Sequence, residues 1–119
     1  GYNPLLPVTE CLFCKIVRRE IPAQIVLEDE QALVFKDITP QAPTHVLLIP
    51  KKHLGSLSSS TDEDVALLGH LQRLACKVAE SAKLSSYRLV TNSGRGAGQS
   101  VDHLHYHLLA GRPMSWPPG

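Results

Sequence analysis

The sequence predicts an α+β fold with an antiparallel sheet of five strands, one long helix and one short helix. Three features carry this prediction: an apolar stripe over residues 62–82, a continuous apolar run over residues 45–50, and histidines at alternate positions 103, 105 and 107. The first pattern is typical of an amphipathic helix, the second of a strand buried on both faces, and the third of a strand with two unlike faces. A chain of 119 residues is long enough for one packed core.

The N-terminal part is expected to begin with a loose segment and a short helix. Residues 1–10 contain two prolines and are interpreted as a lead-in to a single domain over residues 11–119. Residues 11–19 have apolar side chains at helical spacing, which predicts the short helix. Pro22 ends it, because proline disfavours the helical conformation in the residue before it.

Three strands and the long helix follow. Residues 25–28 and 32–37 are predicted to be strands joined by a polar turn, and residues 45–50 to be the central buried strand. Thr61 is the expected N-cap of the helix over residues 62–82, and the acidic residues after it suit the positive end of the helix dipole. The apolar stripe of this helix consists of Val65, Leu68, Leu71, Leu74, Ala75, Val78 and Ala82.

The last part of the chain is predicted to add two more strands. Residues 87–91 form the first, and a glycine-rich loop over residues 92–100 leads to the second, which carries the alternating histidines. Successive side chains of a strand point to opposite faces. The three histidines are therefore expected to line one face, and the apolar residues between them the other.

Composition and charge exclude several classes of protein. The formal net charge of +1 gives no electrostatic footprint for nucleic acid or for a membrane surface. No apolar run approaches the roughly 20 residues that cross a bilayer, and no secretory signal is visible, so a soluble, cytoplasmic protein is expected. Three cysteines in such a chain indicate thiols or metal ligands rather than a disulfide framework.

The alternating histidines are the strongest chemical signal. A single histidine on an apolar face is usually a hydrogen-bonded core residue, but three imidazoles buried together as filler would leave polar groups unmet. The pattern therefore indicates metal binding, nucleophilic catalysis, or both. Neutral imidazole is a nucleophile near pH 7, and a phosphoimidazole can be hydrolysed again. The middle histidine, His105, is best placed to attack phosphorus while its neighbours bind the phosphate.

The glycine-rich loop fits a phosphate substrate. Gly94, Gly96 and Gly98 allow the backbone to approach a ligand closely and to turn N–H groups toward an anion. Such loops are common between strands, and this one matches neither a Walker loop nor a dinucleotide fingerprint. Its position directly before the histidines supports a role, with Gln99 and Ser100 at the mouth of the same site.

Cys11 and Cys14 have the Cys-x-x-Cys spacing that is common in zinc sites. A tetrahedral site needs two further ligands, for which His45, His53 and His103 are the candidates. The alternative is a pair of unligated thiols on a short helix. A redox role is less favoured, because no thioredoxin-like βαβ unit surrounds the pair.

Residues 99–109 resemble the histidine triad signature, in which three alternating histidines are followed by apolar residues. The resemblance extends over residues 11–119, which would form one histidine triad (HIT) domain. It is most specific for the HINT-like branch, the histidine triad nucleotide-binding proteins. The other segments that carry it are Asp37-Ile-Thr-Pro-Gln-Ala-Pro-Thr-His45, Ile49-Pro-Lys-Lys-His53, Leu-Leu-Gly-His70-Leu and Met114-Ser-Trp-Pro-Pro-Gly119.

The resemblance implies a hydrolase of purine nucleoside phosphoramidates, in which AMP is joined to an amine through a P–N bond. By motif position, His105 would attack the α-phosphorus and carry the nucleotidyl group, His107 would hydrogen-bond the phosphate, and Ser100 would lie near the leaving group. The implied nucleotide-binding residues are Phe13, Ile16, Phe35 and Ile38 around the base, Lys36 at its edge, Asp37 at the ribose, and Asn92, Gln99, Ser100 and His107 at the phosphate or ribose.

The resemblance also implies an assembly and a metal. Members are homodimers with one ten-stranded sheet, and their C-terminal tail reaches toward the partner's active site. Many bacterial members hold structural zinc with the cysteine pair and two histidines, whereas catalysis needs no cofactor. On this chain the zinc ligands would be Cys11, Cys14, His53 and His103.

Other interpretations stay open on the sequence alone. A nucleotide-binding regulatory or scaffold protein with incidental hydrolysis would keep the same motifs, and a dinucleoside polyphosphate hydrolase belongs to the same superfamily, although the C-terminal tail argues against it. A zinc-based nucleic-acid binder is poorly supported by the net charge. Two positions depart from the family pattern: Asp102 replaces an aromatic residue and has an open role, and Ala110 replaces a glycine.

Overall fold

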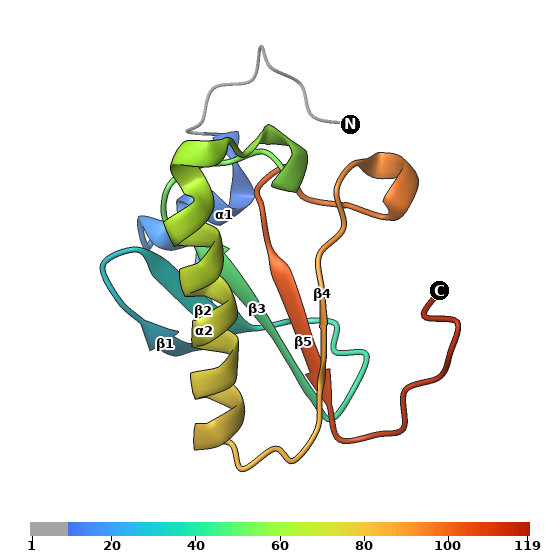
Figure 1. The fold of residues 1–119 in the computed structure, drawn as a ribbon. Coiled ribbons are helices and arrows are strands. Elements are labelled where there is room, and N and C mark those ends of the chain that lie inside the picture. The colour runs from blue at the N-terminus through green and yellow to red at the C-terminus, as the bar shows by residue number, and fades with distance from the viewer. Residues whose placement is uncertain (1–9) are drawn as a thin grey trace.

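A five-stranded antiparallel sheet forms the centre of the structure, with the strands in the order β1-β2-β3-β5-β4 (Figure 1). The computed structural model describes residues 10–119, so residues 1–9 of the expected lead-in lie outside the described residues. The elements are α1 (Leu12–Val17), β1 (Ile25–Glu28), β2 (Ala32–Lys36), β3 (Thr44–Pro50), α2 (Val65–Ser81), β4 (Arg88–Val90) and β5 (Tyr106–Ala110). The predicted α+β class, the order of the elements and the central place of β3 are confirmed.

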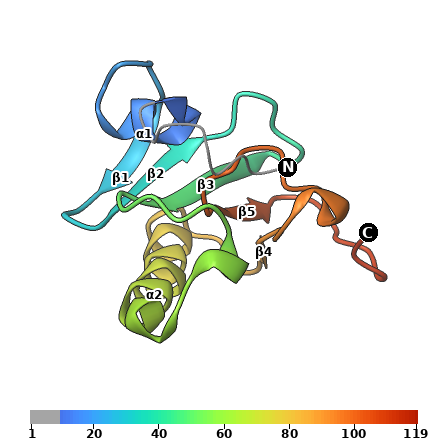
Figure 2. The same cartoon turned by 90° about the horizontal axis from the view of Figure 1, so that it is seen from above.

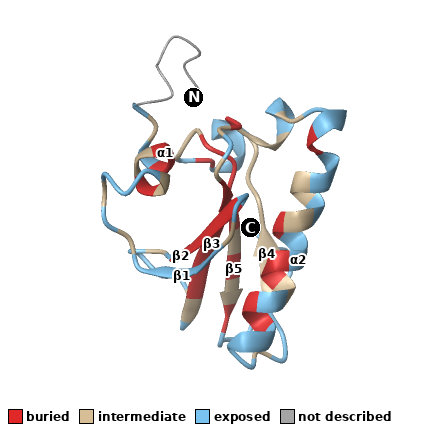
Figure 3. Cartoon of the chain, turned by 90° about the vertical axis from the view of Figure 1, so that its left-hand side faces the viewer, coloured by how far each residue is buried: buried red, intermediate tan, exposed pale blue. Residues whose placement is uncertain are grey.

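The two helices lie on opposite faces of the sheet, as the view from above shows (Figure 2). α2 covers one face, where its Leu71 and Leu74 belong to the same buried cluster as Leu48 of β3. α1 packs on the other face, where Phe13 clusters with Phe35 and other strand residues. β3 lies between the two clusters and is buried along nearly its whole length (Figure 3). Side chains of β3 and β5 that point away from α2 therefore lie on the α1 side.

The long helix starts later than predicted because its cap forms a separate turn. Thr61 is the N-cap, as predicted, and forms a capping box with Asp64. This box closes a 3₁₀ turn over Asp62–Asp64, so the α-helix begins only at Val65. Val65 and Ala82 sit at the two ends and are exposed, which corrects their place in the apolar stripe. No helix in the described part of the chain has the length and apolar composition to cross a membrane.

The last strand is shorter than predicted. β5 begins at Tyr106, so His103 and His105 precede the strand instead of alternating along it. Pairing with β3 stops at Tyr106, which lies opposite Leu48, because Pro50, two residues further along β3, has no N–H group to extend the ladder. The carbonyl of Pro50 is instead hydrogen-bonded by the His103 ring. The prediction of one strand face lined by three histidines is therefore wrong for the first two.

Candidate functional site

A pocket of about 280 Å³ opens on the α1 side of the sheet. Its wall is mainly apolar, and Phe13 packs edge-on against Phe35 with the ring centroids 5.5 Å apart. Ile38 is 97% exposed at the rim, so a large apolar side chain borders an apolar hollow. The residues expected at the base and ribose that line this pocket are Phe13, Ile16, Phe35, Lys36, Asp37 and Ile38.

A second, larger hollow of about 520 Å³ lies between β1, the loop after β2 and the C-terminal end of α2. Asp37 and His45 border it, but His105 and the glycine-rich loop do not. The smaller pocket is lined by His105 together with Ser100. Because the candidate nucleophile and the end of the phosphate loop line the smaller pocket and not the larger hollow, the smaller pocket is the candidate active site.

His105 belongs to the wall of this pocket and is oriented by the backbone just before it. Its Nδ1 donates to the carbonyl oxygen of His103 at 2.7 Å, which leaves the lone pair of the neutral ring on Nε2. Phe13 packs edge-on against the ring, with the centroids 5.2 Å apart. Burial lowers the pKa of His105 below its usual value, so the ring is neutral near pH 7. A neutral ring with a free Nε2 is a nucleophile.

His107 is oriented by a chain of hydrogen bonds that starts at a backbone amide. The N–H of Gln41 donates to Nδ1 of His45 at 3.0 Å, so neutral His45 holds its proton on Nε2. That Nε2 lies 2.9 Å from Nδ1 of His107 and 3.5 Å from a carboxylate oxygen of Asp37. His107 thus accepts at Nδ1 and carries its own proton on Nε2. Burial lowers the pKa of His107 to about 4, which keeps this arrangement neutral.

The loop that supplies the Gln41 amide is held against the residues after β5. Nε of Arg112 donates to the carbonyl oxygen of Gln41 at 2.9 Å. Gly111 has a φ of +98°, and a Cβ built on it would lie 2.8 Å from the Cβ of Pro43. Glycine is the residue that tolerates both this conformation and this close approach. The hydrogen bond to His45 therefore depends on contacts beyond the end of β5.

The glycine-rich loop buries the side chain of Gln99. Its Nε2 donates to two backbone carbonyls, at 2.7 and 2.9 Å, and its Oε1 accepts the N–H of Gly94 at 2.8 Å. The Gln99 side chain thus holds the loop together. Its backbone does the same, because its N–H donates to the carbonyl of Gly94 at 3.1 Å and its carbonyl accepts from Arg95. Ser100 lines the pocket, whereas Asn92 is not among the lining residues.

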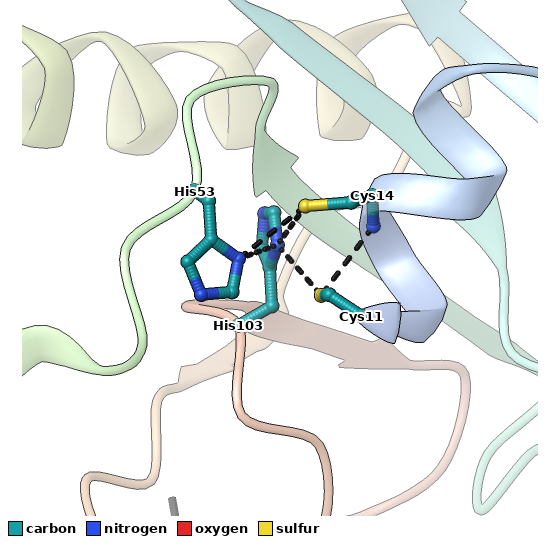
Figure 4. Close-up of side chains that lie close together, drawn as sticks. All are labelled: Cys11, Cys14, His53 and His103. Atoms are coloured by element: carbon teal, nitrogen blue, oxygen red, sulfur yellow. Dashed lines mark hydrogen bonds between the residues drawn. The ribbon is translucent and has the colours of Figure 1, made fainter. Parts of the chain in front are cut away.

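A second cluster brings four side chains together from three parts of the chain (Figure 4). Cys11 and Cys14 come from the start of α1, His53 follows β3, and His103 precedes β5. Each cysteine Sγ lies 3.3 Å from a histidine Nδ1, Cys11 from His103 and Cys14 from His53, and the two Nδ1 atoms are 3.2 Å apart. All four ligand atoms lie within 4.8 Å of one another, close enough to hold one metal ion. His45, the third candidate ligand from the sequence, is not among these four residues and lies instead beside Asp37 and His107.

The protonation pattern of this cluster suits a metal. Nε2 of His103 donates to the carbonyl of Pro50 at 2.8 Å, so the Nδ1 lone pair faces the sulfur atoms. Burial lowers the pKa of His103 to about 4. Burial, followed by the neighbouring Cys11, raises the pKa of Cys14 to about 12. Without a cation the buried thiol resists ionisation, whereas a bound metal ion stabilises the thiolate beside the neutral rings.

The protonation pattern of another cluster, formed by Asp37, His45 and His107, does not suit a metal. These three side chains also place ligand atoms within 4.8 Å of one another. However, Nδ1 of His45 accepts the amide of Gln41, so its Nε2 carries a proton and cannot bind a cation in the neutral ring. The arrangement is a hydrogen-bond relay to His107.

Comparisons with known proteins identify the family. The family model described as "Scavenger mRNA decapping enzyme C-term binding" matches residues 10–116. An uncharacterised HIT-like protein of Synechocystis sp. is 59% identical over 111 residues, which are 92% of this chain and 97% of that protein. The chain belongs to the histidine triad family.

Solved HIT structures share the fold. A HIT family hydrolase from Legionella pneumophila superposes with a TM-score of 0.91 at 53% identity, covering 92% of this chain and 100% of that chain. A HIT family hydrolase from Clostridium thermocellum has a TM-score of 0.88 at 45% identity, covering 92% and 96% of the two chains. The fold predicted from the sequence is therefore the HIT fold.

The role of His45 was not evident from the sequence. The sequence indicated this residue only as a candidate metal ligand, whereas the structure pairs it with His107 in the relay. The available signal was its position at the start of an otherwise apolar run, and in the structure the residue is buried, with 7% exposed. A buried histidine in such a run needs hydrogen-bond partners for both ring nitrogens.

Proposed function

We propose that this HIT protein hydrolyses purine nucleoside phosphoramidates, in which the phosphorus of AMP is bonded to an amine nitrogen. The observation that carries the proposal is the state of His105. Its Nδ1 donates to a carbonyl at 2.7 Å, so Nε2 is a neutral nucleophile in the wall of the pocket. The relatives of known structure from Legionella pneumophila and Clostridium thermocellum are named hydrolases, which supports hydrolysis as the reaction class.

The proposed reaction takes two steps. In the first, Nε2 of His105 attacks the α-phosphorus, a new P–N bond forms, and the bond to the amine breaks. The departing nitrogen takes up a proton from solvent through the hydroxyl of Ser100 at the pocket mouth. In the second step water attacks the phosphorus, gives up a proton, and displaces His105, which releases AMP. Nε2–H of His107 donates to the phosphate oxygens as charge develops on them.

The apolar pocket holds the base in this proposal. Phe13 and Phe35 supply an aromatic wall, and Ile38 covers the rim, with Ile16 and Lys36 at the border. Asp37 suits the ribose, because one carboxylate oxygen already accepts the N–H of Thr39 at 2.7 Å and the other can accept a ribose hydroxyl. Asn92 and Gln99 stay predictions for the phosphate or ribose.

We propose zinc as the metal of the cysteine–histidine cluster. Typical Zn–S and Zn–N bond lengths in a tetrahedral site put sulfur and nitrogen roughly 3.6 Å apart and two nitrogens roughly 3.4 Å apart. The sulfur–nitrogen distances here are 3.3–3.6 Å and the nitrogen–nitrogen distance is 3.2 Å, so the residues fit. The metal is structural and ties α1 to the segments after β3 and before β5. The test is the zinc content of protein purified without chelator.

We also propose a homodimer joined through β4. This strand ends the sheet and pairs only with β5 among the described strands, so its other edge is open. Nη2 of Arg88 in β4 donates to the carbonyl of Ser115, which sets the C-terminal tail beside this edge, and Trp116 in the tail is 83% exposed. Sedimentation velocity is expected to give a dimer, and a monomer at micromolar concentration would contradict the assembly.

The test of function is steady-state hydrolysis of AMP linked through nitrogen to a lysine side chain. His105→Ala is expected to lower kcat at least about 1,000-fold, while AMP binding is retained, because the nucleophile is lost and the pocket is not. His70→Ala is the matched control, since His70 pairs with Asp29 on the α2 side and is outside the site. Unchanged turnover in His105→Ala would remove His105 as the nucleophile.

The same assay separates the rival functions. Faster cleavage of diadenosine polyphosphates than of the phosphoramidate would replace the proposed substrate. AMP binding by the wild-type protein without hydrolysis of either substrate would make it a nucleotide-binding regulator.

A further inference from the structure

The glycine-rich loop is held by a guanidinium group that the proposed reaction does not use. Nη1 of Arg95 donates to the carbonyl oxygens of Gln99 at 3.1 Å and Ser100 at 2.8 Å. Its Nη2 lies 2.7 Å from the carboxylate of Asp102. One side chain thus contacts three of the four residues from 99 to 102.

These contacts fix the direction of two peptide units. The C=O and N–H of a trans peptide point in opposite directions. Because the carbonyls of Gln99 and Ser100 point to Arg95, the N–H groups of Ser100 and Val101 point away from it. Neither N–H donates a hydrogen bond to another residue in the described part of the chain, and Ser100 and Val101 both line the pocket with His105. Adjacent N–H groups of this kind bind anions.

Asp102 gives Arg95 a fixed anchor. It directly precedes His103, whose ring is 0% exposed and hydrogen-bonded to Pro50. The Asp102 side chain is itself largely covered, with 22% exposed, against 44% for Arg95. The carboxylate also keeps the more exposed guanidinium turned toward the loop and away from a phosphate in the pocket.

We infer that Arg95 and Asp102 are positioning residues for the phosphate: Asp102 anchors Arg95, and Arg95 turns the N–H groups of Ser100 and Val101 toward the nucleotide. Neither side chain touches substrate. The inference rests on the proposed function, because it assigns this loop to the phosphate of the substrate. It also gives a role to Asp102, which departs from the family pattern.

The test compares ligands with and without a phosphate. AMP and adenosine affinities and kcat/KM are measured for the wild-type protein, Arg95→Gln, Asp102→Asn and the double variant. Lys77→Gln is the control, because it removes an exposed positive charge on α2. Arg95→Gln is expected to weaken AMP binding about 10-fold and to lower kcat/KM about 100-fold, while adenosine binding changes less than about twofold. Lys77→Gln is expected to change none of these values.

The double variant tests whether the two residues act together. Asp102→Asn alone is expected to lower kcat/KM about fivefold and to add nothing to Arg95→Gln, because its effect passes through Arg95. Metal content should be unchanged in every variant, which separates the pair from the neighbouring cluster. Full additivity of the two substitutions would overturn the anchoring role. Arg95→Lys keeps the charge but not the fork, so wild-type activity in that variant would overturn the role of the two carbonyl contacts.

Failure of the inference is distinct from failure of the proposed function. A wild-type protein that cleaves the phosphoramidate, with the same ratio of AMP to adenosine affinity in Arg95→Gln, overturns only the positioning pair. Equal loss of AMP and adenosine affinity with a lower Tm also overturns it, because that outcome means general damage to the loop. A wild-type protein that neither binds AMP nor cleaves the substrate overturns both.

Discussion

His103 and His45 are both buried histidines, yet the backbone around them gives them opposite chemistry. A carbonyl, that of Pro50, accepts the Nε2 proton of His103, so its Nδ1 lone pair faces Cys11. An amide, that of Gln41, donates to Nδ1 of His45, so its Nε2 proton faces His107. The lone pairs of the first cluster face one another and could bind a cation, whereas in the second cluster the protonated nitrogen of His45 donates to His107. Ligand-type side chains lie equally close together in both clusters. The backbone group next to the histidine, a carbonyl or an amide, decides which ring nitrogen carries the proton.

The largest effect is expected from a substitution that disrupts the relay of Asp37, His45 and His107 and leaves the cysteine–histidine cluster intact. His107→Ala should lower kcat/KM of the phosphoramidate about 100- to 1,000-fold, because a donor to the charged phosphate is lost. The metal content should equal that of the wild-type protein, since His107 is not part of the cysteine–histidine cluster. Elemental analysis beside the kinetic assay checks both values, and loss of metal in this variant would contradict the separation of the clusters.

The next largest effect is expected from a substitution in the cysteine–histidine cluster. Cys14→Ser is expected to lose the metal and to lower the free energy of unfolding by at least about 3 kcal/mol, because metal binding stabilises only the folded chain. Urea unfolding with and without chelator measures it. Chelation should destabilise the wild-type protein and leave Cys14→Ser unchanged. Cys76→Ser is the control, since Cys76 lies on α2 away from the cluster. Equal stability of Cys14→Ser and the wild-type protein would argue against a structural metal.

A pH effect of similar size isolates His107. Its pKa is about 4 in the folded protein against 6.5 for the ordinary side chain. Between these values the unfolded chain binds more protons than the folded chain, so the free energy of unfolding falls as the pH drops from 6.5 to 4. Below pH 4 both states are protonated, and His107 lowers the free energy of unfolding no further. The loss is at most about 3 kcal/mol. His107→Gln should show a correspondingly smaller drop between pH 7 and 4.5 in urea titrations, whereas an identical drop would contradict the lowered pKa.

The smallest expected effect sharpens the account of the relay. His45→Gln keeps an N–H donor at the position of Nε2, and we expect kcat within about threefold of the wild-type value. His45→Leu removes the donor and should lower kcat about 10-fold, because His107 is no longer held in one tautomer. Both variants should bind metal normally. Equal activity of the two variants would show that the donor to His107 does not matter.

Local patterns in the sequence were sufficient for most of the fold. The apolar run that became β3 and the Thr61 cap could be interpreted from neighbouring residues alone. The late start of β5 could not, because it depends on Pro50 of β3, which is distant in the sequence and has no N–H group to extend the pairing. Boundaries that are set by a partner strand are not encoded within the strand itself.

The candidate site divides in the same way. The cysteine spacing and the alternating histidines indicated which side chains carry chemistry, and Cys11, Cys14, His53 and His103 do lie together. The sequence could not show which ring nitrogen is protonated, since that depends on backbone groups brought close by folding. For the same reason the pairing of Arg95 with Asp102 was missed, although Arg95 lies in the glycine-rich loop and Asp102 just after it.

The chemistry of the site also depends on Gly111, a residue that has no side chain. It packs against Pro43, in the same loop that places the amide of Gln41 on His45. A side chain at this position would displace the loop, and the proton of His45 would no longer be confined to one nitrogen. A purely steric change, remote from the pocket and neutral in charge, would then alter the acid–base state of the site. The tolerance of this surface to substitution is thus limited by proton placement as well as by packing.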